Sequence, residues 1–419
     1  MLHLYRTVQI NKNAMTDRLY YHDSFLYEFE GEVREITESP RPAVTLDRTA
    51  FYPTSGGQIH DTGWISSATT KQRVTEVADG EDGRVVHYLE VPAKDLAPGS
   101  HVRGEIDVLR RQDHMQQHSG QHVLSAAFVR LFQMPTVSFH MADDYCAIDL
   151  ETLSLSKEQI ESVESLASEI ILENRLVDIR FVTRAEAGKL GLRKIPATER
   201  DELRLIDISD FDLTACGGTH VRQTGQIGCI LLRKTEKVRQ GYRVEFVAGL
   251  RAVAAARRDF TTLTEAAALF SAHIYEVPRQ ATKVLEDIKT LRKQGAQFLE
   301  ELAAAQAAAL LAETPEADGR RVVVCTFSDR DINFVKLFAQ KLTRLAPNVL
   351  ALLGTSSPHA ALVFAQSSGQ NHDMGARMKE TLGKFGGRGG GSKDMAQGGL
   401  PEASQVEPAL AFAKASFLT

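Results

Sequence analysis

The sequence HMQQHSGQHVLSAAFVRLF, residues 114–132, decides the fold at the middle of this chain, because its periodicity predicts an α-helix. On such a helix His118 and His122 lie one turn apart on the same face, a spacing that suits a shared metal ion. Alone, the pair is weak evidence, since most histidines four residues apart are surface or core residues. His114 lies one turn earlier on the same face. It is interpreted either as a group that supports the site or as an interior histidine.

A second motif, TACGGTH at residues 214–220, follows almost a hundred residues later. It places Cys216 and His220 at the same four-residue spacing, and its two glycines let the backbone approach a ligand closely. Three imidazoles and one thiolate favour zinc over magnesium or calcium. Four protein ligands indicate a structural site, whereas catalysis needs a vacant or displaceable position, and both remain open.

On either side of this helix, the sequence of the N-terminal region predicts β-structure. The rest of the chain is predicted to contain both helices and strands. Short β-rich segments at 25–36, 43–51, 84–91 and 100–107 predict a small antiparallel barrel or sandwich. Residues 1–14 are expected to be a poorly ordered extension. A helix at 157–174 and strands at 177–183 and 226–248 predict an α+β domain. Beyond Gly319, strands at 321–327, 349–354 and 360–365 alternate with helices at 331–345 and 372–384 as a small α/β unit.

Residues 251–316 contain almost no turn residues, and their apolar residues recur at steps of three and four. A break at 271–278 separates two apolar stripes, so we expect an antiparallel helical hairpin. The hairpin packs on its own protein or serves as a dimerisation arm, and the sequence favours neither.

Composition limits the class of protein. The chain has 419 residues, 43% of them hydrophobic and 25% charged, which is typical of a multidomain globular protein. The sequence shows no membrane span and no secretory signal, so we expect a cytosolic protein without membrane partners. Four scattered cysteines do not make a disulfide framework. Net charge is −5, but residues 317–419 hold 12 lysines and arginines against 8 acidic residues, so nucleic acid would be favoured there.

Four motifs together resemble one family. QHSGQH at 117–122 and CGGTH at 216–220 resemble the paired zinc motifs in the editing domain of alanyl-tRNA synthetases, and most of all the freestanding alanyl-tRNA editing proteins of the AlaX type. LDRTAFYPTSGGQ at 46–58 resembles the family's barrel signature, and DMAQGG at 394–399 resembles the end of the synthetases' C-terminal domain. Thr54-Ser55 and Ser392-Lys393 depart from the usual pattern without touching a predicted ligand.

The resemblance implies an α+β multidomain protein in four parts. They are an N-terminal β-barrel at 1–110, a zinc-containing editing domain at 111–250, the helical hairpin at 251–316 and a C-terminal α/β tRNA-binding domain at 317–419. No segment resembles the aminoacylation part of a synthetase. The implied activity is therefore zinc-dependent hydrolysis of the ester in tRNA(Ala) mischarged with serine or glycine. A homodimer would form through the hairpin or the C-terminal domain.

Such an activity is needed for a physical reason. The synthetase pocket that selects alanine discriminates against glycine or serine by only about 10–200-fold. A second site reverses the selection if a buried hydroxyl pairs with serine and stays unpaired with alanine. By resemblance Thr49 is the candidate for that contact, although it also fits an ordinary strand threonine. Gln121 is a further catalytic candidate, for orienting water or the ester carbonyl, and Gln58 is another, for contacting the aminoacyl group.

The remaining candidates contact substrate. Gly56, Gly57 and Thr219 would lie near the aminoacyl group, although Thr219 also fits a residue that fixes the ligand turn. Between residues 377 and 393 five cations face one acid, and a glycine run at 386–391 exposes amides to phosphate, unless the segment is a solvated helix face and linker. The cations named as substrate-binding are Arg388, Lys393 and, on a strand, Arg243.

Two rivals come from other classes. A zinc peptidase would want a glutamate between His118 and His122, and Ser119-Gly120-Gln121 supplies none. A non-catalytic tRNA-binding module with a structural zinc remains the alternative.

Overall fold

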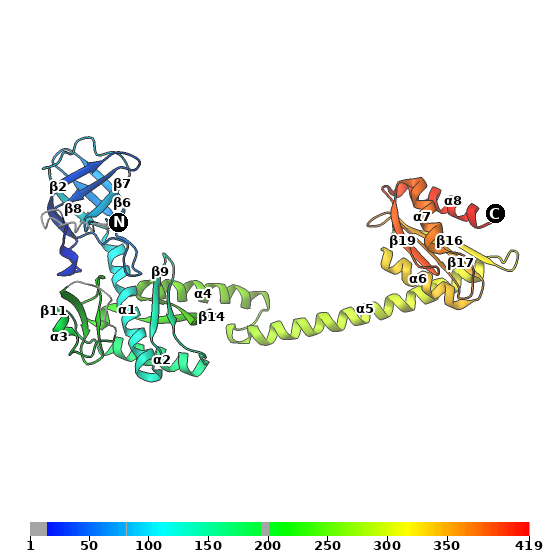
Figure 1. Ribbon diagram of the computed structural model, residues 1–419. Helices are drawn as coiled ribbons and strands as arrows, with labels where there is room; N and C mark the ends of the chain where they lie inside the picture. Colours follow the sequence, from blue (N-terminus) through cyan, green and yellow to red (C-terminus); the bar gives the residue numbers. More distant parts are fainter. Residues whose placement is uncertain (1–14, 81, 194–200, 419) are drawn as a thin grey trace, which may run out of the picture. The chain divides into compact units, whose positions relative to one another are not determined.

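The computed structural model describes residues 15–80, 82–193 and 201–418, in two compact units, Met1–Glu265 and Ala266–Thr419 (Figure 1). The expectation for residues 1–14 lies outside the described residues. The predicted four-part division stays a prediction, and each unit is described by itself.

A closed barrel forms the N-terminal part of the first unit, as the sequence predicts. Every neighbouring pair of strands in it is antiparallel. Valine, leucine and isoleucine side chains that alternate along the strands fill the interior, which is why these segments have a two-residue period. In order around the barrel the strands are β2 (Glu28–Thr37), β3 (Ala43–Leu46), β7 (Val85–Leu89), β6 (Lys71–Asp79), β5 (Gly63–Ser66) and β8 (His101–Ile106).

Two of these strands, β5 and β6, are not expected from the sequence. Strand β5 has only four residues and begins with Gly63, a weak strand former. A Cβ atom at Gly63 would lie 2.1 Å from the Glu105 carbonyl oxygen, so the close approach of strand β8 requires this glycine. Outside the barrel, β1 (Asp17–Arg18) pairs in parallel with β4 (Arg48–Thr49).

Helix α1 (Val108–Phe132) runs through the first unit and is buried along most of its length (Figure 1). It begins at Val108, before the expected residue 114. The sequence did not reveal the earlier start, because the first turn contains charged residues and shows no apolar period. Its apolar side chains share a core with a four-stranded antiparallel sheet and with α2 (Lys157–Leu172). The sheet has the order β14 (Ile230–Val238), β15 (Gly241–Ala248), β10 (Cys146–Leu150) and β9 (Thr136–Met141).

A second sheet, of three antiparallel strands, carries the other metal motif. Its order is β11 (Val177–Thr183), β12 (Glu202–Ile208) and β13 (Asp212–Ala215), and the short helix α3 (Arg184–Ala187) follows β11. Strand β13 ends directly before Cys216, so the register of this sheet fixes where the motif begins.

A fully buried ion pair joins the barrel to α1. Arg111 and Asp61 both have side chains that are 0% exposed, and the Arg111 Nε lies 3.1 Å from each Asp61 carboxylate oxygen. Arg111 also donates to the carbonyl oxygens of Ser24 and Ala50, and the Tyr52 amide donates to Asp61 at 2.7 Å. The pair therefore ties three barrel segments to the first turn of α1.

The second unit is built on a mixed five-stranded sheet. Its order is β16 (Arg321–Phe327), β17 (Val349–Thr355), β18 (Ala361–Gln366), β20 (Met395–Gly399) and β19 (Arg388–Gly391), and only β16 and β17 are parallel. Helix α6 (Ile332–Leu345) covers one face, and α7 (Met374–Phe385) and α8 (Val406–Leu418) cover the other. Most of the glycine run at 386–391, expected to expose amides to phosphate and otherwise to be a linker, lies in the edge strand β19.

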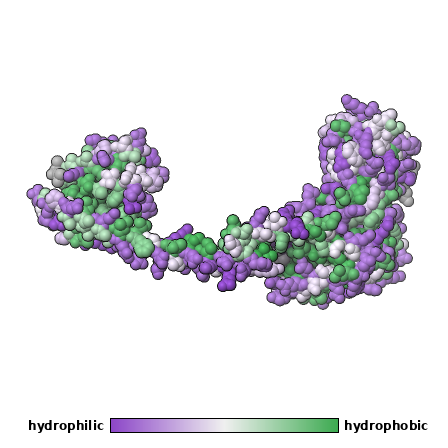
Figure 2. All heavy atoms as spheres, turned by 180° about the vertical axis from the view of Figure 1, so that it is seen from behind, coloured by the Kyte–Doolittle hydropathy of each residue, from purple (hydrophilic) through white to green (hydrophobic). Residues whose placement is uncertain are grey.

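Two helices occupy the region expected as a hairpin, α4 (Gly249–Leu269) and α5 (Val277–Glu313). The C-terminal end of α5 packs on the sheet unit through Ala303, Ala307 and Leu311. Along the rest of α5 apolar and polar side chains lie side by side in solvent (Figure 2), with Phe298 66% exposed. Antiparallel pairing of the helices and dimerisation both stay predictions. No helix of the described residues combines the length and the apolar character needed to cross a membrane.

Replacing Arg111 with Leu should lower the free energy of unfolding of the first unit by about 3–5 kcal/mol, because Asp61 would stay buried without its partner. Trp64, the sole tryptophan, lies in β5, so its fluorescence during denaturant unfolding follows the barrel. Lys157→Ala, which removes an exposed ion pair with Glu161, should lower the free energy of unfolding by no more than about 1 kcal/mol. Equal effects of the two substitutions would refute the structural role of the buried pair.

Candidate metal centre

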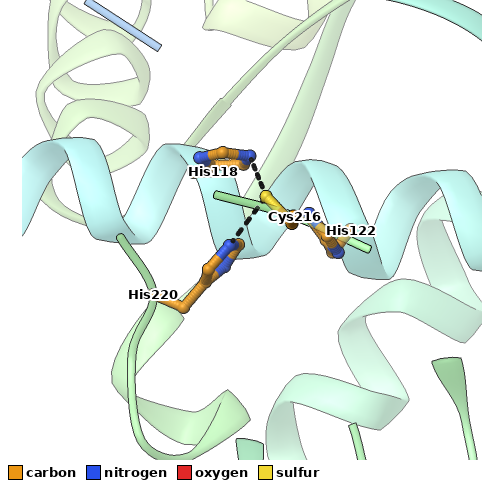
Figure 3. Close-up of side chains that lie close together, drawn as sticks. All are labelled: His118, His122, Cys216 and His220. Atoms are coloured by element: carbon orange, nitrogen blue, oxygen red, sulfur yellow. Dashed lines mark hydrogen bonds between the residues drawn. The ribbon is translucent and has the colours of Figure 1, made fainter. Parts of the chain in front are cut away.

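Two distant segments bring four metal-binding side chains together. His118 and His122 project from one face of α1, and Cys216 and His220 follow β13. One ligand atom from each residue lies within 4.8 Å of the others, and the three histidines are each 3% exposed (Figure 3). The convergence predicted from the sequence is therefore present.

The distances between these atoms fit a shared ion. The Cys216 Sγ lies 3.4 Å from the His118 Nε2 and 3.3 Å from the His220 Nε2. Ligands at about 2.3 Å and 2.0–2.1 Å around a tetrahedral zinc would be about 3.6 Å apart. The residues present thus match a borderline-soft divalent metal in both spacing and donor type.

The second ring nitrogen of each histidine faces a different polar group. The His118 Nδ1 lies 2.8 Å from the Gln58 Oε1, the His220 Nδ1 lies 3.2 Å from the Ser119 Oγ, and the His122 Nδ1 lies 3.5 Å from the Asp212 Oδ2. All three Nδ1 atoms are therefore directed away from the cluster, which leaves each Nε2 for the metal. Such partners fix the tautomer and orientation of metal-binding histidines.

Gln58 belongs to the barrel yet reaches the metal ligands. Its Oε1 also accepts from the Thr219 amide at 3.1 Å, and its Nε2 donates to the Thr219 hydroxyl at 2.9 Å. Both side chains are 0% exposed. In this arrangement Gln58 and Thr219 hold His118 and the ligand turn in place.

Two glycines permit this packing. A Cβ atom at Gly218 would lie 2.1 Å from the His118 Cε1, so any other residue would displace the ring. Gly57 has φ +86°, and a Cβ atom there would lie 2.4 Å from the Phe139 carbonyl oxygen. By contrast, a Cβ atom at Gly56 would meet open space.

The electrostatics favour a thiolate. Burial alone would raise the pKa of the Cys216 thiol, but the electrostatic attraction of the neighbouring imidazoles of His118 and His220 and hydrogen bonds from His118 and His122 lower it well below its ordinary value of 9.0. Burial lowers the pKa of His220, which keeps this imidazole neutral. Neutral imidazole and thiolate are the forms that bind metal.

Other candidates lie apart from the cluster or are engaged elsewhere. The Thr49 hydroxyl lies 2.8 Å from the His87 Nε2 inside the barrel. Gln121 donates to the Ser125 hydroxyl at 2.7 Å, and Arg243 pairs with Asp149 at 2.7 Å. Arg388 and Lys393 belong to the second unit, and their roles stay predictions.

His114 is an interior histidine rather than a fifth member of the cluster. It is 1% exposed, and burial together with the charges of Arg110, Arg251 and Arg111 lowers its pKa to about 2. A neutral imidazole in the core therefore suits its place on α1.

Sequence reasoning missed Asp212 and Ser119 as partners of the ligands, and Arg111 and Asp61 as the support of the site. Asp212 lies four residues before Cys216, and Ser119 follows His118, so proximity to the motifs was the available signal. No local pattern links Arg111 to a residue fifty positions earlier.

Family models match three parts of the chain. They are described as "tRNA synthetases class II (A)" at residues 3–110, "Threonyl and Alanyl tRNA synthetase second additional domain" at 203–244 and "DHHA1 domain" at 319–418.

Individual relatives match almost the whole chain. The "Alanyl-tRNA editing protein AlaX-L" of Pyrococcus horikoshii is 28% identical over 92% of this chain and 94% of its own length. The "Alanine--tRNA ligase" of Pyrococcus abyssi is 31% identical over 94% of this chain, which spans 43% of that ligase. The solved C-Ala domain of the Aquifex aeolicus alanyl-tRNA synthetase aligns with 24% of this chain and 95% of its own, with 16% identity and a TM-score of 0.23.

Gly218→Ala should remove most of the bound metal, because the new methyl group collides with the His118 ring. Gly217→Ala is the matched control, since its Cβ atom would make ordinary contact with Tyr21 at 3.6 Å. Metal per chain, measured by atomic emission after desalting, should fall only in the first variant. Full metal content in Gly218→Ala would contradict the packing described for His118.

Proposed function

Because the chain belongs to the family of AlaX-type alanyl-tRNA editing proteins, we propose that it hydrolyses the ester of tRNA(Ala) mischarged with serine or glycine in a zinc-dependent reaction. The observation that carries this proposal is the convergence of His118, His122, Cys216 and His220 on one point. The zinc ligands, catalytic residues and substrate contacts are all part of the proposal.

Each group in the site has a task in this reaction. Cys216 and the three histidines hold zinc, which when bound supplies a Lewis acid for water or for the substrate. An aminoacyl ester is already activated, so positioning of water beside it suffices without a protein nucleophile. Gln58 acts through His118 and Thr219, whose positions it fixes, and the exposed Gly56 lies two residues before it.

The Thr49 hydroxyl has hydrogen-bonding properties that suit recognition of serine. The His87 Nδ1 lies 3.1 Å from the Val44 carbonyl oxygen and must donate to it, so the neutral Nε2 accepts from the Thr49 hydroxyl. Burial lowers the pKa of His87 to about 4, which keeps the ring neutral. The Thr49 oxygen also accepts from the Phe51 amide at 3.1 Å. Thr49 is buried in this structure, and its one remaining lone pair would make it only an acceptor toward a substrate, which serine satisfies and alanine does not.

The second candidate function is a tRNA-binding module with a structural zinc. One observation favours it: the four side chains by themselves complete a tetrahedral set, as in structural zinc sites. The two functions differ in one respect, since only the first predicts release of the amino acid.

The protein should release serine from mischarged tRNA(Ala) and leave alanyl-tRNA(Ala) largely intact. Cys216→Ala should reduce the rate at least about 100-fold with loss of zinc, since even changes outside the ligand set cost about 10–100-fold. Cys229→Ala, an exposed cysteine outside the cluster, is the control. Labelled serine measured against time gives the rate. Retention of tRNA without deacylation by the wild-type protein would establish the alternative.

The second unit is proposed to bind the body of the tRNA. Of the five cations between 377 and 393, Arg377 pairs with Glu380, and Lys384 lies over the Phe412 ring. Among the residues that the structure describes, Lys379, Arg388 and Lys393 have no carboxylate within ion-pair distance, and of these Arg388 and Lys393 are the predicted phosphate contacts. Arg388 begins the edge strand β19, whose glycines leave the outer backbone accessible.

Arg388→Ala with Lys393→Ala should weaken binding of uncharged tRNA(Ala) and reduce the slope of log K against log salt by about one unit per lost phosphate contact. Lys341→Ala, which removes a cation already paired with Glu300, should leave the slope unchanged. Filter binding at several salt concentrations measures both. An unchanged slope in the double variant would exclude these two side chains as phosphate contacts.

A further inference from the structure

Asp212 supplies the one charged group among the three Nδ1 partners of the ligand histidines. His118 faces an amide oxygen and His220 faces a hydroxyl, whereas His122 faces a carboxylate. Asp212 is 6% exposed and is the first residue of β13, four positions before Cys216. A buried carboxylate in contact with a ligand ring therefore belongs to the same strand that leads to the thiolate.

The His122 Nδ1 is a buried polar atom without a hydrogen bond in this structure. The Asp212 Oδ2 is 3.5 Å away, at the outer limit of a hydrogen bond. If the Nε2 of His122 binds a metal, the ring proton must be on Nδ1, where it needs an acceptor. A small rotation of the imidazole toward Asp212 would supply one.

Arg193 keeps the Asp212 carboxylate in place. Its Nε lies 2.8 Å from the Oδ1 and its second terminal nitrogen lies 3.1 Å from the Oδ2, a two-point contact that fixes the plane of the carboxylate. The same carboxylate thus contacts a guanidinium on one side and a ligand imidazole on the other. Both Asp212 and Arg193 also line a cavity of about 680 Å³ beside the C-terminal half of α1, so the pair is accessible from one side.

We propose that Asp212, held by Arg193, is a positioning residue that accepts the Nδ1 proton of His122 and thereby sets how tightly the metal is held. This inference rests on the zinc site of the proposed function. A thiolate and three neutral imidazoles leave one positive charge on a divalent ion, and Asp212, although its charge is balanced by Arg193, gives the His122 ring a charged acceptor. Gln58 and Ser119, which are neutral, orient their histidines without this contribution.

The test compares metal binding in Asp212→Ala, Asp212→Asn and the wild-type chain. Removal of the carboxylate should lower zinc affinity about 10- to 100-fold, as measured by competition with a chromophoric chelator. Asp212→Asn keeps an acceptor oxygen but loses the charge, so its affinity should lie between the other two. In cobalt-loaded protein the visible absorption bands should shift in Asp212→Ala, because the orientation of one imidazole changes.

Asp207→Asn is the matched control. It removes the same charge from the neighbouring strand β12, where Asp207 pairs with the partly exposed Arg180. Its zinc affinity and cobalt spectrum should equal those of the wild-type protein. Asp212→Ala with Arg193→Ala removes both partners of the buried pair, so this variant decides the question if Asp212→Ala alone does not fold.

Two outcomes would overturn the proposal: a wild-type zinc affinity in the folded Asp212→Ala protein or in the double variant, or an equal loss in Asp207→Asn. Because zinc binding is measured without tRNA, weaker binding in Asp212→Ala supports the positioning role even if no ester is hydrolysed. Absence of deacylation by the wild-type protein would count against the proposed function alone.

Discussion

The buried pair between Arg111 and Asp61 is the constraint on which the metal centre depends. Neither charge can reach water, so the pair is stable only while the Ser24 and Ala50 carbonyls and the Tyr52 amide complete its hydrogen bonds. Those partners lie in segments next to the barrel strands, while Arg111 lies in the first turn of the helix that carries two of the candidate metal ligands. The barrel and the helix therefore have one permitted arrangement, and that arrangement presents Gln58 to His118.

The centre is accordingly a joint product of three segments. Helix α1 supplies two of the proposed ligands, the turn after β13 supplies the other two, and the loop with Gln58 supplies the amide that holds His118. Gly218 allows the turn and the helix to approach within a distance that no side chain would permit. Serine recognition by Thr49 would depend on the barrel in the same way, since His87 and Phe51 together use its proton and one of its lone pairs.

The sequence predicted what depends on local spacing. A helical period places His118 and His122 on one face, and a two-residue period marks most of the barrel strands. Apart from the convergence of the two metal motifs, which the family resemblance implied, it did not predict contacts between distant residues. Arg111 and Arg243 resemble surface arginines until Asp61 and Asp149 are seen beside them. Likewise, residues 388–391 of the glycine run form a strand because β20 supplies their hydrogen bonds.

The distance along the chain between the ligand pairs has a consequence for biosynthesis. The helix with His118 and His122 leaves the ribosome long before Cys216 and His220 are translated, so a nascent chain has only two of the four candidate ligands to offer a metal. Two such ligands bind weakly and exchange readily. A translation product released before residue 220 would therefore stay in the apo form, and metal capture would mark the completion of the first unit.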